Sequence, residues 1–144
     1  MTLIELLVVL GIIGMILGIG VPALTGYAKQ VRLKTTTRQV VGLVSLARSL
    51  AISTRAEHAV IVDPEEREVR VVNQASGEAL EQIVRLPTSV SVEMEVGGQT
   101  IKDMEFSFRP SGALTGRSVS LVLADGQKQQ TVVVTGTTGA VAVQ

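Results

Sequence analysis

The sequence predicts an α+β fold, in which a long N-terminal helix is followed by an antiparallel β-sheet. Three observations lead to this prediction. Residues 6–24 are apolar apart from glycines and one proline. Apolar residues then recur with the 3.6-residue period of a helix up to about residue 54, and from residue 57 the period changes to two. With 144 residues, the chain has room for one globular domain and one apolar helix.

The first segment carries one charged side chain, Glu5, and the next charge along the chain is Lys29. About 20 apolar helical residues match the ~30 Å hydrocarbon core of a bilayer. A carboxylate inside such a segment costs roughly 2.5–3.5 kcal/mol on insertion, which favours a functional role for it. A carboxylate close to the lipid headgroups would instead be an incidental part of a membrane anchor, and position alone leaves both interpretations open.

The helical pattern continues beyond the apolar run. Val40, Val44, Ala47 and Ala51 recur at steps of four, three and four residues, which is the spacing of a buried helix face. We therefore expect one helix from about Thr2 to Thr54, with Arg48 and Arg55 together on one flank of the apolar stripe. At 1.5 Å per residue this helix is roughly 80 Å long.

The first half of this helix contains residues that disfavour helix. Pro22 removes a backbone donor and crowds the preceding turn, so a kink is expected there. Four glycines weaken the same half: Gly11, Gly14, Gly18 and Gly20. Gly14 and Gly18 also form a GxxxG step, which allows close contact with another helix, although flexibility alone is an alternative role. We expect a hydrophobic transmembrane or filament-core helix at 1–28 and a globular domain at 29–144, with its helical half at about 29–55 and its sheet at about 57–144.

Short strands are expected throughout the second part of the chain. The segment Ser89–Val96 alternates strictly, with valines and Met94 on one face and Ser91, Glu93 and Glu95 on the other. Turns are expected at Asp63–Glu66, at Gly97-Gly98 and at Asp125-Gly126. The other predicted strands are His58–Asp63, Arg67–Val72, Gln82–Leu86, Met104–Phe108, Ser118–Leu123, Gln129–Thr135 and Ala140–Val143.

The side chains needed for most catalytic and metal sites are scarce. The chain has one histidine, His58, and no cysteine, so multi-histidine and thiolate metal sites are excluded. No G-x-S-x-G nucleophile motif occurs. The acidic stretch 63–68 lacks the ligand spacing of a calcium loop and is expected to be a solvated turn. We therefore expect no enzyme activity, no cofactor and no metal.

The net charge is zero, but the charges are segregated. Residues 29–55 contain six bases and no acid, whereas four acids cluster at Asp63, Glu65, Glu66 and Glu68. Such asymmetry suggests an electrostatic partner. The basic helix could face the acidic domain of its own chain, or it could face an acidic surface of another copy. The sequence does not decide between these two.

The N-terminal residues Met1-Thr2-Leu3-Ile4-Glu5-Leu6-Leu7-Val8-Val9, followed by Pro22, resemble the N-terminus of type IV pilins and of type II secretion pseudopilins. The match covers Thr2–Leu6, and the chain departs from the usual pattern at Met1, where the family commonly has Phe. No basic segment precedes the apolar run, so the chain looks like a mature chain after removal of a basic leader. An expression start at Met1 is the alternative.

The rest of the chain extends this resemblance. The segments Ala51–Arg55, Glu105–Gly112 and the closing stretch 134–143 are similar to the minor pseudopilin H and FimT-type minor pilins, which share the GspH/FimT domain. This resemblance covers most of residues 30–144. It implies the pilin fold, in which the long helix packs on the sheet domain.

The resemblance also implies a function. It implies a structural subunit of a type IV pilus-like or type II secretion filament that assembles through its N-terminal helix. Met1 would be the processed, N-methylated terminus, Glu5 the charge partner of a neighbouring subunit, and Gly14, Gly18 and Pro22 a helix break. The implied partners are other pilin or pseudopilin subunits, an inner-membrane assembly platform and, before assembly, the membrane. The implied location is the bacterial inner membrane, as a single-pass protein with a cytoplasmic N-terminus, and then a periplasmic or extracellular filament.

Two other functions stay open. A DNA-binding minor pilin of natural transformation needs exposed lysines and arginines at its binding site, whereas the tail 135–144 has none. The sequence therefore argues against nucleic acid as a partner. The second alternative is a membrane-anchored periplasmic domain outside any filament.

Overall fold

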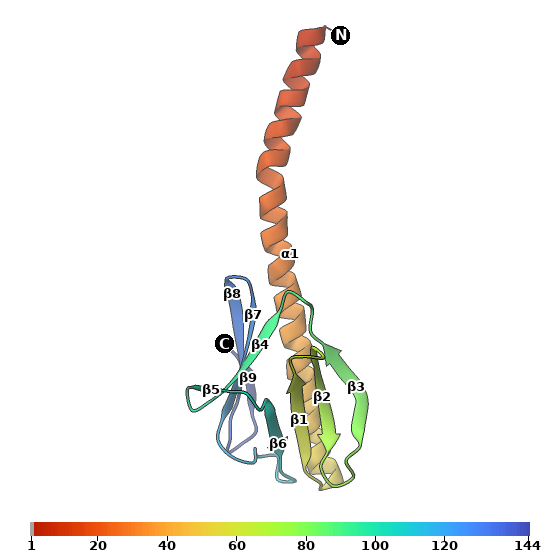
Figure 1. Cartoon of the computed structure of the whole chain (residues 1–144), viewed down its shortest axis with the longest axis vertical. Coiled ribbons are helices and arrows are strands. Elements are labelled where there is room, and N and C mark those ends of the chain that lie inside the picture. The colour runs from red at the N-terminus through yellow and green to blue at the C-terminus, as the bar shows by residue number, and fades with distance from the viewer. Residues whose placement is uncertain (1) are drawn as a thin grey trace. The chain divides into compact units, whose positions relative to one another are not determined.

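The computed structural model describes residues 2–144, and within the helix it omits the side chains of residues 19–24. The helix α1 spans Leu3–Thr54 and is followed by strands β1–β9 (Figure 1). The helix expected from about Thr2 to Thr54 is therefore confirmed. Two compact units are present, Met1–Arg32 and Leu33–Gln144, and each is described by itself.

The second unit has one hydrophobic core, and α1 contributes one face to it. The stripe expected from the sequence is confirmed, because Val40, Val44, Ala47 and Ala51 are all buried. Leu33 and Leu43 extend this buried face. The core is completed by side chains from the inner faces of the strands, so the packing of a helix on antiparallel strands is confirmed.

The helix ends after Thr54 because the next residue leaves the helical conformation. Arg55 has φ +52, the left-handed conformation that glycine more often supplies at this position. The hydroxyl of Thr54 donates to the carbonyl oxygen of Leu50 at 2.7 Å. Arg55 is thus exposed and lies outside α1, rather than on the helix flank beside Arg48 as expected.

The first sheet has four strands: β1 (His58–Asp63), β2 (Glu68–Asn73), β3 (Ala79–Arg85) and β6 (Glu105–Phe108). Their order is β3-β2-β1-β6, and every pair is antiparallel. Val60, Val69, Phe106 and Phe108 point into the core, and the two phenylalanine rings meet edge to face at 6.0 Å. The predicted strands at 58–63, 67–72, 82–86 and 104–108 are therefore confirmed, with shifted ends.

The second sheet has five strands: β4 (Ser91–Val96), β5 (Gln99–Ile101), β7 (Val119–Asp125), β8 (Lys128–Val134) and β9 (Val141–Val143). Their order is β5-β4-β7-β8-β9. In β4 the expected alternation is confirmed, because Val92 and Met94 are buried while Ser91 and Glu93 are exposed. The sequence did not predict β5, which has three residues and no buried position.

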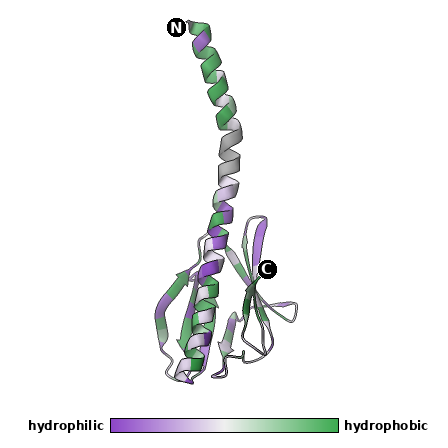
Figure 2. Ribbon diagram, turned by 180° about the vertical axis from the view of Figure 1, so that it is seen from behind, coloured by the Kyte–Doolittle hydropathy of each residue, from purple (hydrophilic) through white to green (hydrophobic). Residues whose placement is uncertain are grey.

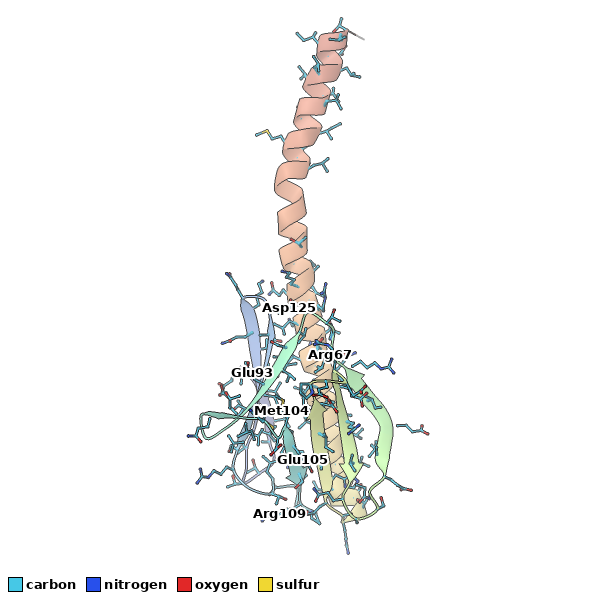
Figure 3. All side chains as sticks on the ribbon, viewed as in Figure 1. Arg67, Glu93, Met104, Glu105, Arg109 and Asp125 are labelled. Atoms are coloured by element: carbon cyan, nitrogen blue, oxygen red, sulfur yellow. The ribbon has the colours of Figure 1, made fainter. Side chains whose placement is uncertain are left out.

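The presence of two sheets differs from the single sheet expected from the sequence. The chain passes from β3 to β4 through residues 86–90, which contact Arg67 and Asp125, both labelled in Figure 3. The guanidinium of Arg67 donates to the carbonyl oxygens of Pro87 and Val90, while the hydroxyl of Ser89 donates to Asp125 Oδ2 at 3.1 Å. Alternation along a strand shows which side chains face inward. It does not show which strands share hydrogen bonds, and that is why the division was missed.

Two of the expected turns can be compared with the structure residue by residue. Gly97-Gly98 joins β4 to β5 with positive φ at both residues, as a tight hairpin requires. The turn between β7 and β8 lies one residue later than expected, at 126–127, because Asp125 pairs with Lys128 as a strand residue. Asp125 is 3% exposed, and its hydrogen bond with Ser89 accounts for this buried position.

Candidate assembly site

The first part of α1 exposes its apolar side chains around its whole circumference. Every large apolar side chain from Leu3 to Leu17 is at least 45% exposed, and Leu3 and Met15 exceed 70%. Figure 2 shows this segment as a nearly continuous hydrophobic ribbon. A helix that is apolar on all sides is normally buried in a protein core or a membrane. Within the first unit, the described residues leave this apolar surface uncovered.

The glycines of this segment leave open surface. A Cβ placed at Gly11, Gly14 or Gly18 would meet nothing within 4 Å outside the local helix backbone. Packing within the chain therefore does not explain these glycines. Gly14 and Gly18 lie four residues apart, so they form the flat patch that a second helix can approach closely.

Glu5 lies in the first turn of α1 and forms a reciprocal contact with Thr2. The backbone N–H of Thr2 donates to Glu5 Oε2 at 3.4 Å, and the backbone N–H of Glu5 donates to Thr2 Oγ1 at 3.4 Å. This is the capping-box arrangement, in which side chains accept from backbone N–H groups at the helix start. The Glu5 N–H also donates to the carbonyl oxygen of Thr2 at 3.1 Å. Our sequence reasoning missed the capping box, although the spacing Thr-x-x-Glu is its known signature.

Other predicted site residues fall partly outside the described residues. Met1 is not described, and neither is the side chain of Pro22. The roles of Met1 as the processed terminus and of Pro22 as part of a helix break therefore stay predictions. Within the described side chains, no stretch of α1 is both long and apolar enough to cross a membrane.

The C-terminal tail is fixed to the domain by Arg48. Arg48 Nε donates to the carbonyl oxygen of Gly112 at 3.1 Å, and Nη2 donates to that of Thr138 at 2.9 Å. A Cβ at Gly139 would overlap the carbonyl oxygen of Gly112, so these two loops touch through their backbones. The sequence placed Arg48 on a helix flank but gave no sign of these partners, which lie 64 and 90 residues away.

The groups considered for metal binding are used in local structure. His58 opens β1 in a buried position, and its Nδ1 lies 3.1 Å from the carbonyl oxygen of Ala56. Asp63 Oδ1 accepts hydrogen bonds from the backbone N–H groups of Glu65 and Glu66, as in an Asx turn. In the part of the chain that the structure describes, no three His, Cys, Asp or Glu side chains are grouped to hold a metal ion.

Comparison with known proteins finds similarity at the level of structure. No protein-family profile and no curated protein matches this chain. The type IV minor pilin FimU of Pseudomonas aeruginosa is similar, with a TM-score of 0.65, 13% identity, and coverage of 82% of this chain and 92% of FimU.

The minor pseudopilin EpsH from the type II secretion system of Vibrio cholerae is also similar. It has a TM-score of 0.64, 14% identity, and coverage of 78% of this chain and 95% of EpsH. A second EpsH structure gives a TM-score of 0.62 at the same identity, with 96% of EpsH covered. With its long N-terminal helix packed on antiparallel sheets, the chain therefore has the type IV pilin-like fold of the minor pilins and minor pseudopilins.

Proposed function

We propose that this chain is a structural subunit of a type IV pilus-like filament or of a type II secretion pseudopilus, and that it assembles through its N-terminal helix. One observation carries the proposal: residues 3–17 of α1 expose apolar side chains on every side, on a chain that has the minor pilin fold. Bundling with the same segment of other subunits would bury this surface, at a gain of about 25 cal/mol per Å². The chain acts in this way as a building block without enzyme activity or cofactor.

Before assembly, the same segment is stored in the bacterial inner membrane as a single pass, with its N-terminus in the cytoplasm. The apolar run 6–24 supports this stage, because its length as a helix matches the hydrocarbon core of a bilayer. An inner-membrane assembly platform then moves the subunit into a periplasmic or extracellular filament. The partners in that filament are other pilin or pseudopilin subunits.

Glu5 guides the incoming subunit. Both hydrogen bonds of its capping box are 3.4 Å long, beyond the usual 2.7–3.2 Å range of a strong N–H···O bond. The carboxylate is exposed and forms no ion pair within the described residues, so it can accept a cation. In a low-dielectric setting an unpaired carboxylate is costly. The methylated amine of Met1 on a neighbouring subunit is the cation we propose for it.

Gly14, Gly18 and Pro22 have a role in the assembled filament. They allow the helix to unwind locally in the filament, where neighbouring subunits satisfy the freed backbone groups. In the described chain the backbone of 11–18 is helical. The unwinding is therefore a property that we expect of the assembled filament.

The test separates the charge of Glu5 from its capping role. Glu5→Gln keeps the capping box, since Gln also serves at this position, but it removes the charge. Glu5→Leu removes both, and Glu5→Asp keeps the charge with a shorter reach. We expect Glu5→Gln and Glu5→Leu to abolish or sharply reduce recovery of the chain in sheared filaments. Glu5→Asp should be intermediate, and all three variants should reach the membrane.

Thr2→Ala is the matched control, because it removes the hydroxyl cap, at about 0.5–2 kcal/mol, without touching the carboxylate. We expect it to assemble better than Glu5→Gln. If Glu5→Leu assembled as well as the parent chain, Glu5 would be incidental, and a membrane-anchored domain outside any filament would explain the chain better.

A further inference from the structure

The second unit carries two oppositely charged surfaces, in which three of the four charged side chains are exposed and Glu95 is half-buried. Lys34 and Arg38 form the basic one, and Glu93 and Glu95 form the acidic one. None of the four side chains makes an ion pair with any residue that the structure describes.

The basic surface lies on the outward face of α1. Lys34 and Arg38 are four residues apart and so project from the same side of the helix. Leu33, Val40 and Val44 occupy the buried side, while Lys34 and Arg38 are both exposed. Between residues 29 and 55 the sequence has no acid that could neutralise them along the helix.

The acidic surface lies on the outward face of the five-stranded sheet. Val92 and Met94 are buried in the core. Successive side chains of a strand alternate, so Glu93, which Figure 3 labels, and Glu95 project from the opposite face of β4. The register places uncharged residues beside them: Val122 opposite Glu93, and Ser120 and Thr100 beside Glu95.

The remaining outward positions of that sheet are also uncharged. Across β7, β8 and β9 they are Ala124, Gln129, Thr131, Val133 and Ala142. Among the described strand residues the outward face therefore carries acids and no base. Its centre is made of small and β-branched side chains, which suits close contact with a helix.

The acidic turn that the sequence singled out is a poorer counterpart. Asp63 accepts hydrogen bonds from its own turn, and Glu68 pairs with Arg70 at 3.4 Å. Two of its four acids are therefore already occupied. Glu65 and Glu66 are exposed at the tip of the turn between β1 and β2. They do not lie on the face of a sheet, as Glu93 and Glu95 do.

We propose that the Lys34–Arg38 face of α1 in one copy docks on the Glu93–Glu95 face of the sheet in a second copy. This inference rests on the proposed function, since it names an interface within the filament. The two surfaces are different parts of one chain, and each is directed away from the shared core. Contact between unlike surfaces of identical chains is heterologous, and when it does not close into a ring it produces a helical filament. Charge complementarity then sets the register of the subunits.

The test uses charge reversal in the full chain, read as the amount recovered in sheared filaments from cells that make only the variant. Glu93→Lys with Glu95→Lys places like charges together and should lower recovery about tenfold or more. Lys34→Glu with Arg38→Glu should have a similar effect. The chain with all four changes should regain most of the parent's recovery, which also shows that the altered chains fold.

A matched control keeps the change in net charge but moves its location. Glu65→Lys with Glu66→Lys alters the turn tip by the same charge and should leave recovery within about twofold, since isolated surface charges contribute little. If the chain with Glu93→Lys and Glu95→Lys were recovered in filaments at the parent's level, the proposed interface would be wrong. The filament role would remain intact.

Two further outcomes also overturn the proposal. Loss in the β4 variant that the four-change chain does not restore would show that a different subunit, rather than a second copy, occupies the surface. Absence of the parent chain itself from filaments would contradict the proposed function, and the interface would fall with it.

The chain has no cysteine, so introduced cysteines offer a direct check. Arg38→Cys on one copy and Glu95→Cys on another should form a disulfide-linked dimer. Arg38→Cys paired with Glu65→Cys should not.

Discussion

The two parts of α1 show how one helix can serve two different environments. Residues 3–17 expose every large apolar side chain, whereas residues 33–51 bury Val40, Val44, Ala47 and Ala51 on one face and leave polar residues on the other. A one-sided apolar stripe can be satisfied by a single sheet domain in the same chain. An apolar surface on all sides needs cover all round, which only a lipid bilayer or several neighbouring helices provide. We therefore propose that residues 33–144 fold by themselves and that residues 3–17 depend on other molecules for their cover.

The largest difference between the two parts is expected when a carboxylate is placed in each of them. Val44→Asp buries a charge at a site with no exposed surface and should destabilise the domain by more than about 4 kcal/mol. Leu10→Asp changes a side chain that is 57% exposed and should leave domain unfolding unchanged while impairing assembly. Thermal unfolding by circular dichroism tests both, and equal losses of stability in both variants would contradict the division.

Gly139 tests how much the contact between two loops contributes to the stability of the domain. Gly139→Ala puts a Cβ into the carbonyl of Gly112 at φ +65, so we expect a loss of roughly 2–4 kcal/mol. Gly77→Ala is the control, because Gly77 has φ +72 but open space around it, and about 1 kcal/mol is expected there. Urea denaturation measures the difference, and similar losses at the two sites would show that the contact of the two loops is unimportant.

Arg48 tests the helix side of the same contact. Arg48→Met keeps much of the apolar stem but removes two hydrogen bonds to the carbonyls of Gly112 and Thr138, with an expected loss of about 1–3 kcal/mol. Arg38→Met on the outward face should change stability by less than about 0.5 kcal/mol. A stability of Arg48→Met equal to that of Arg38→Met would mean that the tail is held by its strand pairing alone.

The smallest effect is expected from removing the first part of the helix. A chain starting at Lys29 should be soluble and monomeric, with the mixed helix and strand signal of the full domain, because the core begins at Leu33. Size-exclusion chromatography and circular dichroism check this. Aggregation or loss of structure would show that the domain depends on residues 1–28 after all.

Local pattern was enough to predict much of this structure. The helix stripe, the alternation of β4 and the Gly97-Gly98 hairpin all follow from the spacing of neighbouring residues, and the structure confirms them. The division into two sheets, the buried position of Asp125 and the contacts of Arg48 depend on residues far apart in the sequence. A single sequence carries no direct signal for such pairs. The capping box of Thr2 and Glu5 is different, since its signal was present in the spacing and was overlooked.

An electron-microscopy reconstruction of a filament containing this chain would show directly whether residues 3–17 are buried between subunits. We predict that residues 3–17 lie in the filament interior against the helices of neighbouring subunits. Glu5 should lie beside a subunit N-terminus, and the helix should be unwound near Gly14–Pro22. A filament in which residues 3–17 stay exposed, or in which α1 is unbroken and Glu5 has no cationic partner, would contradict this prediction.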